Sequence, residues 1–142
     1  PIDERKVTEY QATKELGAAQ RTELVSRADG TKLGEMIITS TSVTIIPTEN
    51  LRFIADSGTF NAFFIRKILN SMVAKDDELV KTGKLNPRQK MSYEIAENSD
   101  GTLKQIKISN FREESRQRHI STTIRWTLEK ISQKITEDKR AT

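Results

Sequence analysis

The side chains best suited to chemistry in this sequence are cations interleaved with aromatic rings. Aromatic rings stack on unpaired bases of any sequence, and lysine and arginine side chains contact phosphates. The candidate residues are Phe63, Arg66, Lys67, Lys84, Arg88, Lys90, Arg112, Arg116, Arg118, His119, Arg125, Trp126 and Lys130. This combination predicts a non-enzymatic surface that binds single-stranded DNA or RNA.

Phe63 and Trp126 also admit a second interpretation. Large aromatic side chains are usually buried, so both rings could pack against other elements or against a second subunit. The protein would then be a structural or adaptor subunit of a larger complex, with the same helix faces as protein–protein interfaces. Salt dependence separates the two functions, because counterion release weakens nucleic-acid binding steeply as salt rises.

Catalysis is not expected from this sequence. His119 is the only histidine, and no nucleophile or carboxylate pair stands at a diagnostic spacing from it. Asp76, Asp77 and Glu78 are consecutive acids, which are common near the start of a helix because they favour its dipole. The chain has no cysteine, which excludes disulfides and thiolate zinc sites. We therefore expect no metal and no cofactor.

Phe63 lies in a segment, residues 57–72, whose apolar residues recur with helical periodicity. At about 100° per residue, one broad face of this central helix is apolar and is expected to face the core. Phe63 falls on the opposite side, beside Arg66 and Lys67. The expected core residues are Phe60, Phe64, Ile65, Ile68, Leu69 and Met72. The continued helix is expected to end near Gly83, because glycine suits a helix C-terminus.

Trp126 lies in a second expected helix, over residues 112–135. Its aliphatic residues recur at spacings of four, four, three and four, with Trp126 on the opposite side. They are Ile120, Ile124, Leu128, Ile131 and Ile135. This seam either covers the sheet of its own subunit or pairs with a second copy in a short coiled coil. The second alternative would make the protein a homodimer through its C-terminal helix.

Two regions are expected to form strands. Residues 36–46 are rich in β-branched side chains, and residues 91–108 alternate between apolar and polar on both sides of Asp100-Gly101, a strong hairpin dipeptide. We expect an antiparallel sheet covered by the central and C-terminal helices, in a single α+β domain spanning residues 1–142. The alternative is a largely helical assembly with a protruding hairpin.

Three shorter patterns carry weaker expectations. Residues 15–27 are expected to be helical, and residues 51–54 are expected to form a short edge strand. Asn110, followed three residues later by Glu113, resembles a capping box that would open the last helix.

The net charge of +4 is unevenly distributed along the chain. From residue 103 onward there are ten Lys and Arg against five Asp and Glu, whereas residues 1–102 hold fourteen against fifteen. This excess favours an anionic partner, nucleic acid above an acidic membrane. No segment approaches the roughly 18 apolar residues of a spanning helix, and the first ten residues are too polar for a secretory signal. We therefore expect a cytoplasmic protein without membrane contact.

Three segments carry a resemblance to a known family. They are LRFIADSGTFNAFFIRKIL at 51–69, QKMSYEIAENSDGTLKQIKI at 89–108 and HISTTIRWTLEKI at 119–131. Together they resemble small archaeal proteins of the ThermoDBP group, which bind single-stranded DNA without an OB fold. The resemblance spans residues 51–135 and implies a helix-and-sheet cleft and a dimerising C-terminal helix. It assigns no role to an individual residue.

Overall fold

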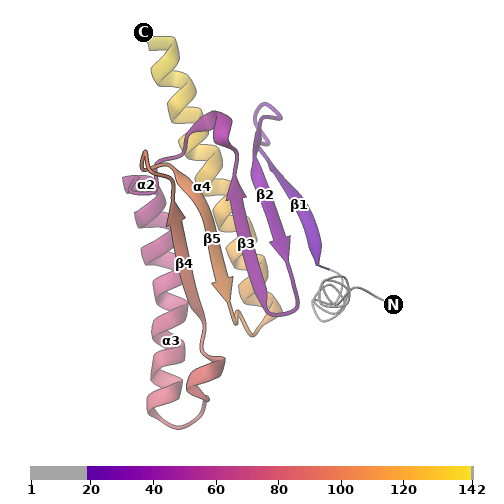
Figure 1. Cartoon of the computed structure of the whole chain (residues 1–142), viewed down its shortest axis with the longest axis vertical. Coiled ribbons are helices and arrows are strands. Elements are labelled where there is room, and N and C mark those ends of the chain that lie inside the picture. The colour runs from indigo at the N-terminus through magenta and orange to yellow at the C-terminus, as the bar shows by residue number, and fades with distance from the viewer. Residues whose placement is uncertain (1–18, 142) are drawn as a thin grey trace, which may run out of the picture.

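The structure is a computed structural model that describes the backbone of residues 19–141 and the side chains of residues 19–49 and 51–135. Within this range, five strands form one antiparallel sheet in the order β1-β2-β3-β5-β4 (Figure 1). The strands are β1 (Gln20–Val25), β2 (Lys32–Ile38), β3 (Ser42–Pro47), β4 (Ser92–Glu97) and β5 (Leu103–Ser109). The predicted hairpin over 91–108 and the predicted strands within 36–46 are confirmed.

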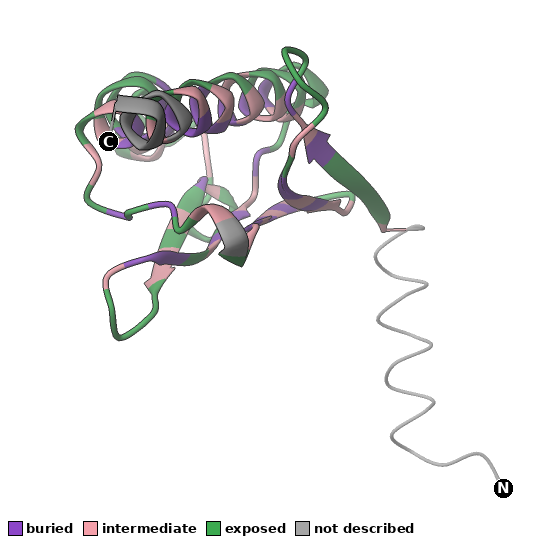
Figure 2. Cartoon of the chain, turned by 90° about the horizontal axis from the view of Figure 1, so that it is seen from above, coloured by how far each residue is buried: buried purple, intermediate pink, exposed green. Residues whose placement is uncertain are grey.

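Two long helical segments pack on one face of this sheet and run in opposite directions (Figure 1 and Figure 2). The first is continuous and consists of α2 (Gly58–Phe60), the π-helix η2 (Asn61–Leu69) and α3 (Asn70–Lys81). The second is α4 (Glu114–Ala141). The short 3₁₀ turns η1 (Glu49–Leu51) and η3 (Pro87–Gln89) lie in the connections. The predicted α+β fold, a sheet covered by a central and a long C-terminal helix, is confirmed.

Side-chain alternation along the strands explains why the helices cover only one face. Val43 and Ile45 of β3 pair with Ile108 and Ile106 of β5, and all four side chains are fully buried. Thr44, between the two buried residues of β3, belongs to the opposite and partly exposed face. Because burying one such aliphatic side chain contributes roughly 1.5–3 kcal/mol, the face rich in these residues is the one that the helices cover.

The helices contribute the core residues that their periodicity predicts. Every predicted core residue of the central helix is buried, and the seam of α4 is buried from Ile120 to Ile131, with Ile135 partly buried. The seam therefore covers the sheet of its own subunit. A coiled coil with a second copy cannot use the same side chains, so dimerisation through another face of α4 stays a prediction.

The helix predicted over residues 15–27 is wrong in its described part. Residues Gln20–Val25 form the edge strand β1, paired antiparallel with β2, and residues 15–18 lie outside the described residues. The segment is polar, so its own composition gives little strand signal. Arg21 Nη1 contacts Glu35 Oε2 across the two strands at 2.5 Å, and β2 supplies the hydrogen-bonding partner. Tertiary pairing therefore overrides the local pattern.

The edge strand predicted over residues 51–54 is also wrong. Leu51 ends the turn η1, and Arg52 has a left-handed φ of 48°, which interrupts an extended chain. Ile54 makes only an isolated bridge to Thr102. The segment is thus a bend that leads into the central helix.

The predicted capping box is wrong in its assignment of Asn110. The backbone carbonyl of Glu113 accepts hydrogen bonds from the amides of Arg116 and Gln117, so Glu113 precedes the first turn of α4. The Asn110 side chain instead donates to the backbone carbonyls of Arg88 and Lys90, at 3.1 and 3.2 Å. It fastens the β5–α4 connection to the segment before β4.

The backbones of β2 and β3 approach each other closely at Gly34. A Cβ atom at this position would lie 2.5 Å from the carbonyl oxygen of Ile46 and 2.8 Å from Cα of Pro47. These are backbone atoms of β3, which cannot move without breaking the β2–β3 ladder.

We expect Gly34→Ala to lower the free energy of unfolding by about 1–3 kcal/mol, because the added methyl group overpacks the β2–β3 contact. Gly58→Ala is the matched control, since a Cβ at Gly58 meets nothing within 4 Å. Its free energy of unfolding should change by no more than about 0.5 kcal/mol. Urea denaturation of both variants measures the difference, and equal stabilities would contradict the close approach.

Candidate nucleic-acid interface

Phe63 of η2 and Trp126 of α4 come together on the side of the two helices that faces away from the core. Their ring centroids are 5.2 Å apart and their planes are inclined by 75°, an edge-to-face pair. Phe63 is 41% exposed and Trp126 is 43% exposed. The predicted placement of each ring opposite the core is confirmed, and the structure adds that the two rings touch.

A pocket of about 290 Å³ adjoins this ring pair, and we call it the aromatic pocket. It is lined by Phe63, Lys67, Ile68, His119, Thr122, Thr123 and Trp126. Lys130 Nζ lies 5.7 Å from the centroid of the Trp126 ring, within range of a cation–π interaction. A flat aromatic group such as a nucleobase could stack here, with hydroxyl and cationic groups at its edge.

A second pocket of about 400 Å³ lies further along the same two helices, and we call it the cationic pocket. It is lined by Lys67, Ile68, Ser71, Met72, Lys75, Glu113, Ser115, Arg116 and His119. Lys67 and Lys75 have no ion-pair partner among the described residues. Glu113 is the one carboxylate in the described lining, and its Oε2 accepts a hydrogen bond from Ser115 Oγ at 3.4 Å.

The two pockets are neighbours, because Lys67, Ile68 and His119 line both of them, and we treat the pair as one candidate site. We call it the interhelical groove. The central helix contributes one wall and α4 the other. Since the helices run in opposite directions, the start of α4 lies beside α3, and Trp126, further along α4, lies beside η2. One end of the groove is therefore aromatic and the other cationic.

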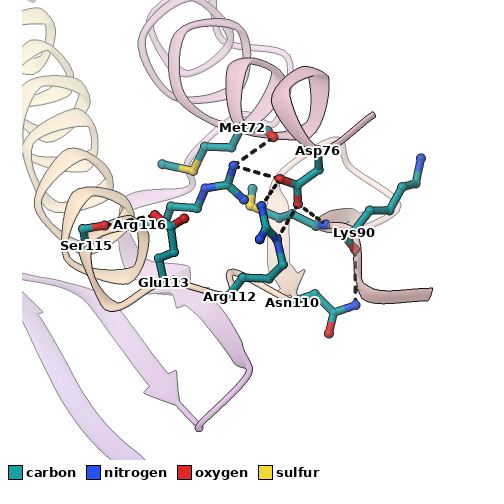
Figure 3. A network of polar contacts seen from close by, with 9 residues as sticks. Met72, Asp76, Lys90, Asn110, Arg112, Glu113, Ser115 and Arg116 are labelled. Atoms are coloured by element: carbon teal, nitrogen blue, oxygen red, sulfur yellow. Dashed lines mark hydrogen bonds and ion pairs between the residues drawn. The ribbon is translucent and has the colours of Figure 1, made fainter. Parts of the chain in front are cut away.

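Beside the cationic pocket, the buried carboxylate of Asp76 holds four donors (Figure 3). Its Oδ2 accepts from the Met91 amide at 2.7 Å and from Arg112 Nε at 3.1 Å. Its Oδ1 accepts from Arg112 Nη2 and from Arg116 Nη2, the latter at 2.9 Å. We call Asp76, Met91, Arg112 and Arg116 the Asp76 clasp. It joins α3, the start of the β4 region and the entry to α4.

The clasp determines the charge state of Asp76. Burial alone would raise the pKa of this carboxyl, but the hydrogen bonds from Arg112, Arg116 and the Met91 amide outweigh burial and hold the pKa well below its usual range. Asp76 is therefore ionised at neutral pH.

Arg112 and Arg116 are predicted phosphate ligands, but both of their guanidinium groups are directed at Asp76. The Arg116 side chain is only 9% exposed, and its Nη2 also donates to the Met72 carbonyl at 3.4 Å. Its Nη1 is buried and has no hydrogen-bond partner within the described part of the chain. This geometry gives both arginines a structural role in positioning the start of α4.

The predicted cations of the connection after α3 lie away from the aromatic pair. Lys84 and Arg88 are exposed, and Lys90 Nζ contacts Asp77 Oδ1 at 2.7 Å. At a rise of about 1.5 Å per residue, the end of α3 lies roughly 25 Å along the helix from Phe63. None of the three lines the interhelical groove.

The other predicted cations divide between the groove and its surroundings. Lys67 and His119 line both pockets, and Lys130 lies beside the Trp126 ring. Arg66 and Arg118 are exposed but lie outside the linings. Arg125 lines a smaller depression between α4 and strands β1 and β2, on the other flank of the helix.

Sequence reasoning missed Lys75 and Ser71 in the cationic pocket. A usable signal was present, because Lys67 and Lys75 are eight residues apart, about two helical turns, and Ser115 and His119 are one turn apart. Each pair therefore shares a helix face. The spacing of residues within one helix does not predict which faces of two helices are in contact, because this depends on the tertiary structure.

Neither a metal centre nor a membrane span is found in the described residues. No group of three or more His, Asp and Glu side chains there could hold a metal ion. None of the described helices combines the length and the continuous apolar character needed to cross a bilayer.

Comparisons with protein-family models, with curated proteins and with solved structures found no match. The resemblance to the ThermoDBP group therefore stays a prediction.

We expect Asp76→Asn to lower the free energy of unfolding by about 3–5 kcal/mol, because it leaves two arginines without their shared counter-charge in a largely buried site. Asp77→Asn is the matched control, since Asp77 pairs with Lys90 at the surface and such pairs contribute at most about 1 kcal/mol. Thermal and urea unfolding of the two variants measure both effects. Similar losses in the two variants would contradict the structural importance of the clasp.

The same carboxylate predicts a pH dependence of stability. The pKa of Asp76 is lower in the folded protein than its ordinary value of 3.8, so its contribution is fully present above that value and is lost as the pH falls toward the folded pKa. The difference in free energy of unfolding between the unmodified protein and Asp76→Asn should therefore shrink below about pH 4. A difference that stays constant down to pH 2 would contradict the lowered pKa.

Proposed function

We propose that this protein binds single-stranded nucleic acid in the interhelical groove without catalysing a reaction. The observation that carries the proposal is the exposed edge-to-face pair of Phe63 and Trp126, set in a groove with unpaired lysines. Stacking on aromatic side chains and contact between cations and the backbone are the two components of single-strand binding. The ligand is DNA or RNA, because neither component distinguishes the sugar.

The charges around the groove support an anionic ligand. Lys67 and Lys75 line it and Lys130 lies at the Trp126 ring, and all three lack an ion-pair partner in the described part of the chain. Among the described residues, Glu113 is the only acidic one that lines either pocket. A protein ligand of mixed charge would gain little from this one-sided lining, whereas a polyanion gains at each cation.

The side chains around His119 give no support to acid–base catalysis. His119 makes no hydrogen bond to a carboxylate or hydroxyl within the described residues, and the Asp76 carboxylate is fully occupied by its four donors. The proposal is therefore for a binding protein. A cytoplasmic location and a homo-oligomer that uses a face of α4 outside the seam are parts of the same proposal.

We expect Phe63→Ala and Trp126→Ala each to weaken the binding of a short oligothymidylate by about 1–3 kcal/mol, because each removes a stacking surface. Each ring is about three-fifths buried and the two touch edge to face, so the melting temperature should also fall, and the affinities are compared at a temperature at which both variants are folded. Fluorescence anisotropy of a labelled oligonucleotide measures the affinity. Ile54→Ala is the control, because Ile54 is 49% exposed but does not line the groove.

The salt dependence of the unmodified protein tests the adaptor alternative. A nucleic-acid binder loses affinity along a straight line of log K against log salt, with a slope near −0.7 for each phosphate contacted on a single strand. An adaptor would bind the oligonucleotide feebly and only at low salt. If the unmodified protein gives no saturable binding at physiological salt, or if Trp126→Ala unfolds or dissociates it, the aromatic pair is a protein contact and the proposal is wrong.

A further inference from the structure

The interhelical groove changes chemical character along its length. The aromatic pocket contains both exposed rings, whereas the described lining of the cationic pocket contains no Phe, Tyr or Trp and has only the smaller imidazole ring of His119. The cationic pocket instead collects Lys67, Lys75, His119 and the hydroxyls of Ser71 and Ser115. A nucleobase has little to stack on at this end, but a phosphate finds donors from both helices.

The lysines of the cationic pocket are available to a ligand, whereas its arginine is not. Arg116 Nη2 is held by Asp76 and by the Met72 carbonyl, and Arg112 is held by Asp76 as well. Lys67 and Lys75 are exposed and make no ion pair with any described residue. The Asp76 clasp therefore engages two arginines and leaves Lys67 and Lys75 as the unpaired lysines of the described lining.

Glu113, the single carboxylate of the described lining, makes no ion pair with these lysines. Glu113 accepts a hydrogen bond from Ser115 Oγ, and its charge acts favourably on Arg112. The cationic pocket also lies at the start of α4, where the helix dipole is positive and adds to the attraction for an anion.

We propose that the groove divides the work of binding, with one base of the strand held in the aromatic pocket and the adjoining phosphates held by Lys67, Lys75 and His119 in the cationic pocket. This inference rests on the proposed function. It assigns Lys75, a residue outside the sequence-predicted set, as a phosphate ligand. It also limits the contacted strand to a short segment, because Trp126 and Ser115 are separated by roughly 16 Å of helix.

The test compares two forms of the same short oligothymidylate, one with ordinary phosphodiester linkages and one with neutral methylphosphonate linkages. The two forms carry the same bases, so they separate stacking from phosphate contact. Lys75→Gln should weaken binding of the charged form, make its salt slope shallower by about 0.7, and leave the affinity for the neutral form unchanged. Trp126→Ala should weaken both forms by the same factor.

Lys84→Gln is the matched control, because Lys84 is an exposed lysine outside the groove. It should leave both affinities and the salt slope unchanged. If Lys75→Gln behaves like Lys84→Gln, or if it weakens the neutral form as much as the charged form, the phosphate site is wrong while nucleic-acid binding stands. If the unmodified protein binds neither form, the proposed function itself is wrong.

Discussion

A buried carboxylate needs hydrogen-bond donors around it, and Asp76 is such a carboxylate. The placement of α3 and α4 on either side of the groove depends on the donors that Asp76 receives. An ionised side chain without water or partners is very unfavourable, so α3 can pack against the sheet only if Arg112 and Arg116 reach it. Those two arginines stand at the entry and in the first turn of α4. The requirement of one side chain thereby sets where α4 starts relative to α3.

Because an α-helix is stiff, the position of the start of α4 also determines where the residues further along α4 lie. Arg116 is held at the clasp, His119 lies about one turn further on, and Trp126 lies about two turns beyond His119. On the opposite wall, Lys67 and Phe63 follow in reverse order. Helix α4 is thus held at its start by the ion pair between Arg116 and Asp76, and along its length by the packing of its aliphatic seam on the sheet. Together these contacts position Trp126 against Phe63.

Local periodicity predicted the helices, the hairpin and the outward orientation of both rings, because each depends on which side of an element is buried. Periodicity could not predict that Phe63 contacts Trp126, because the sequence pattern of one helix does not show which face of another helix it meets. The arginines show the same limit. The sequence around an arginine does not tell whether its guanidinium group binds a phosphate or pairs with a carboxylate of the same chain. The deciding residue, Asp76, lies in an acidic run that was expected near a helix start, but the run is close to the end of α3, where the helix dipole does not favour acids. Strand β1 was missed because its strand character comes from pairing with β2.

The backbone of Arg112 restricts which residues could ever replace it. Its φ of 67° lies in the left-handed region, which glycine adopts without steric strain. Glycine, however, has no side chain that could donate a hydrogen bond to Asp76. Lysine would keep the charge but would lose the planar pair of N–H groups that contacts both carboxylate oxygens. Asparagine tolerates the conformation but is neutral and short. Over evolutionary time, positions 76 and 112 are therefore expected to change together or not at all.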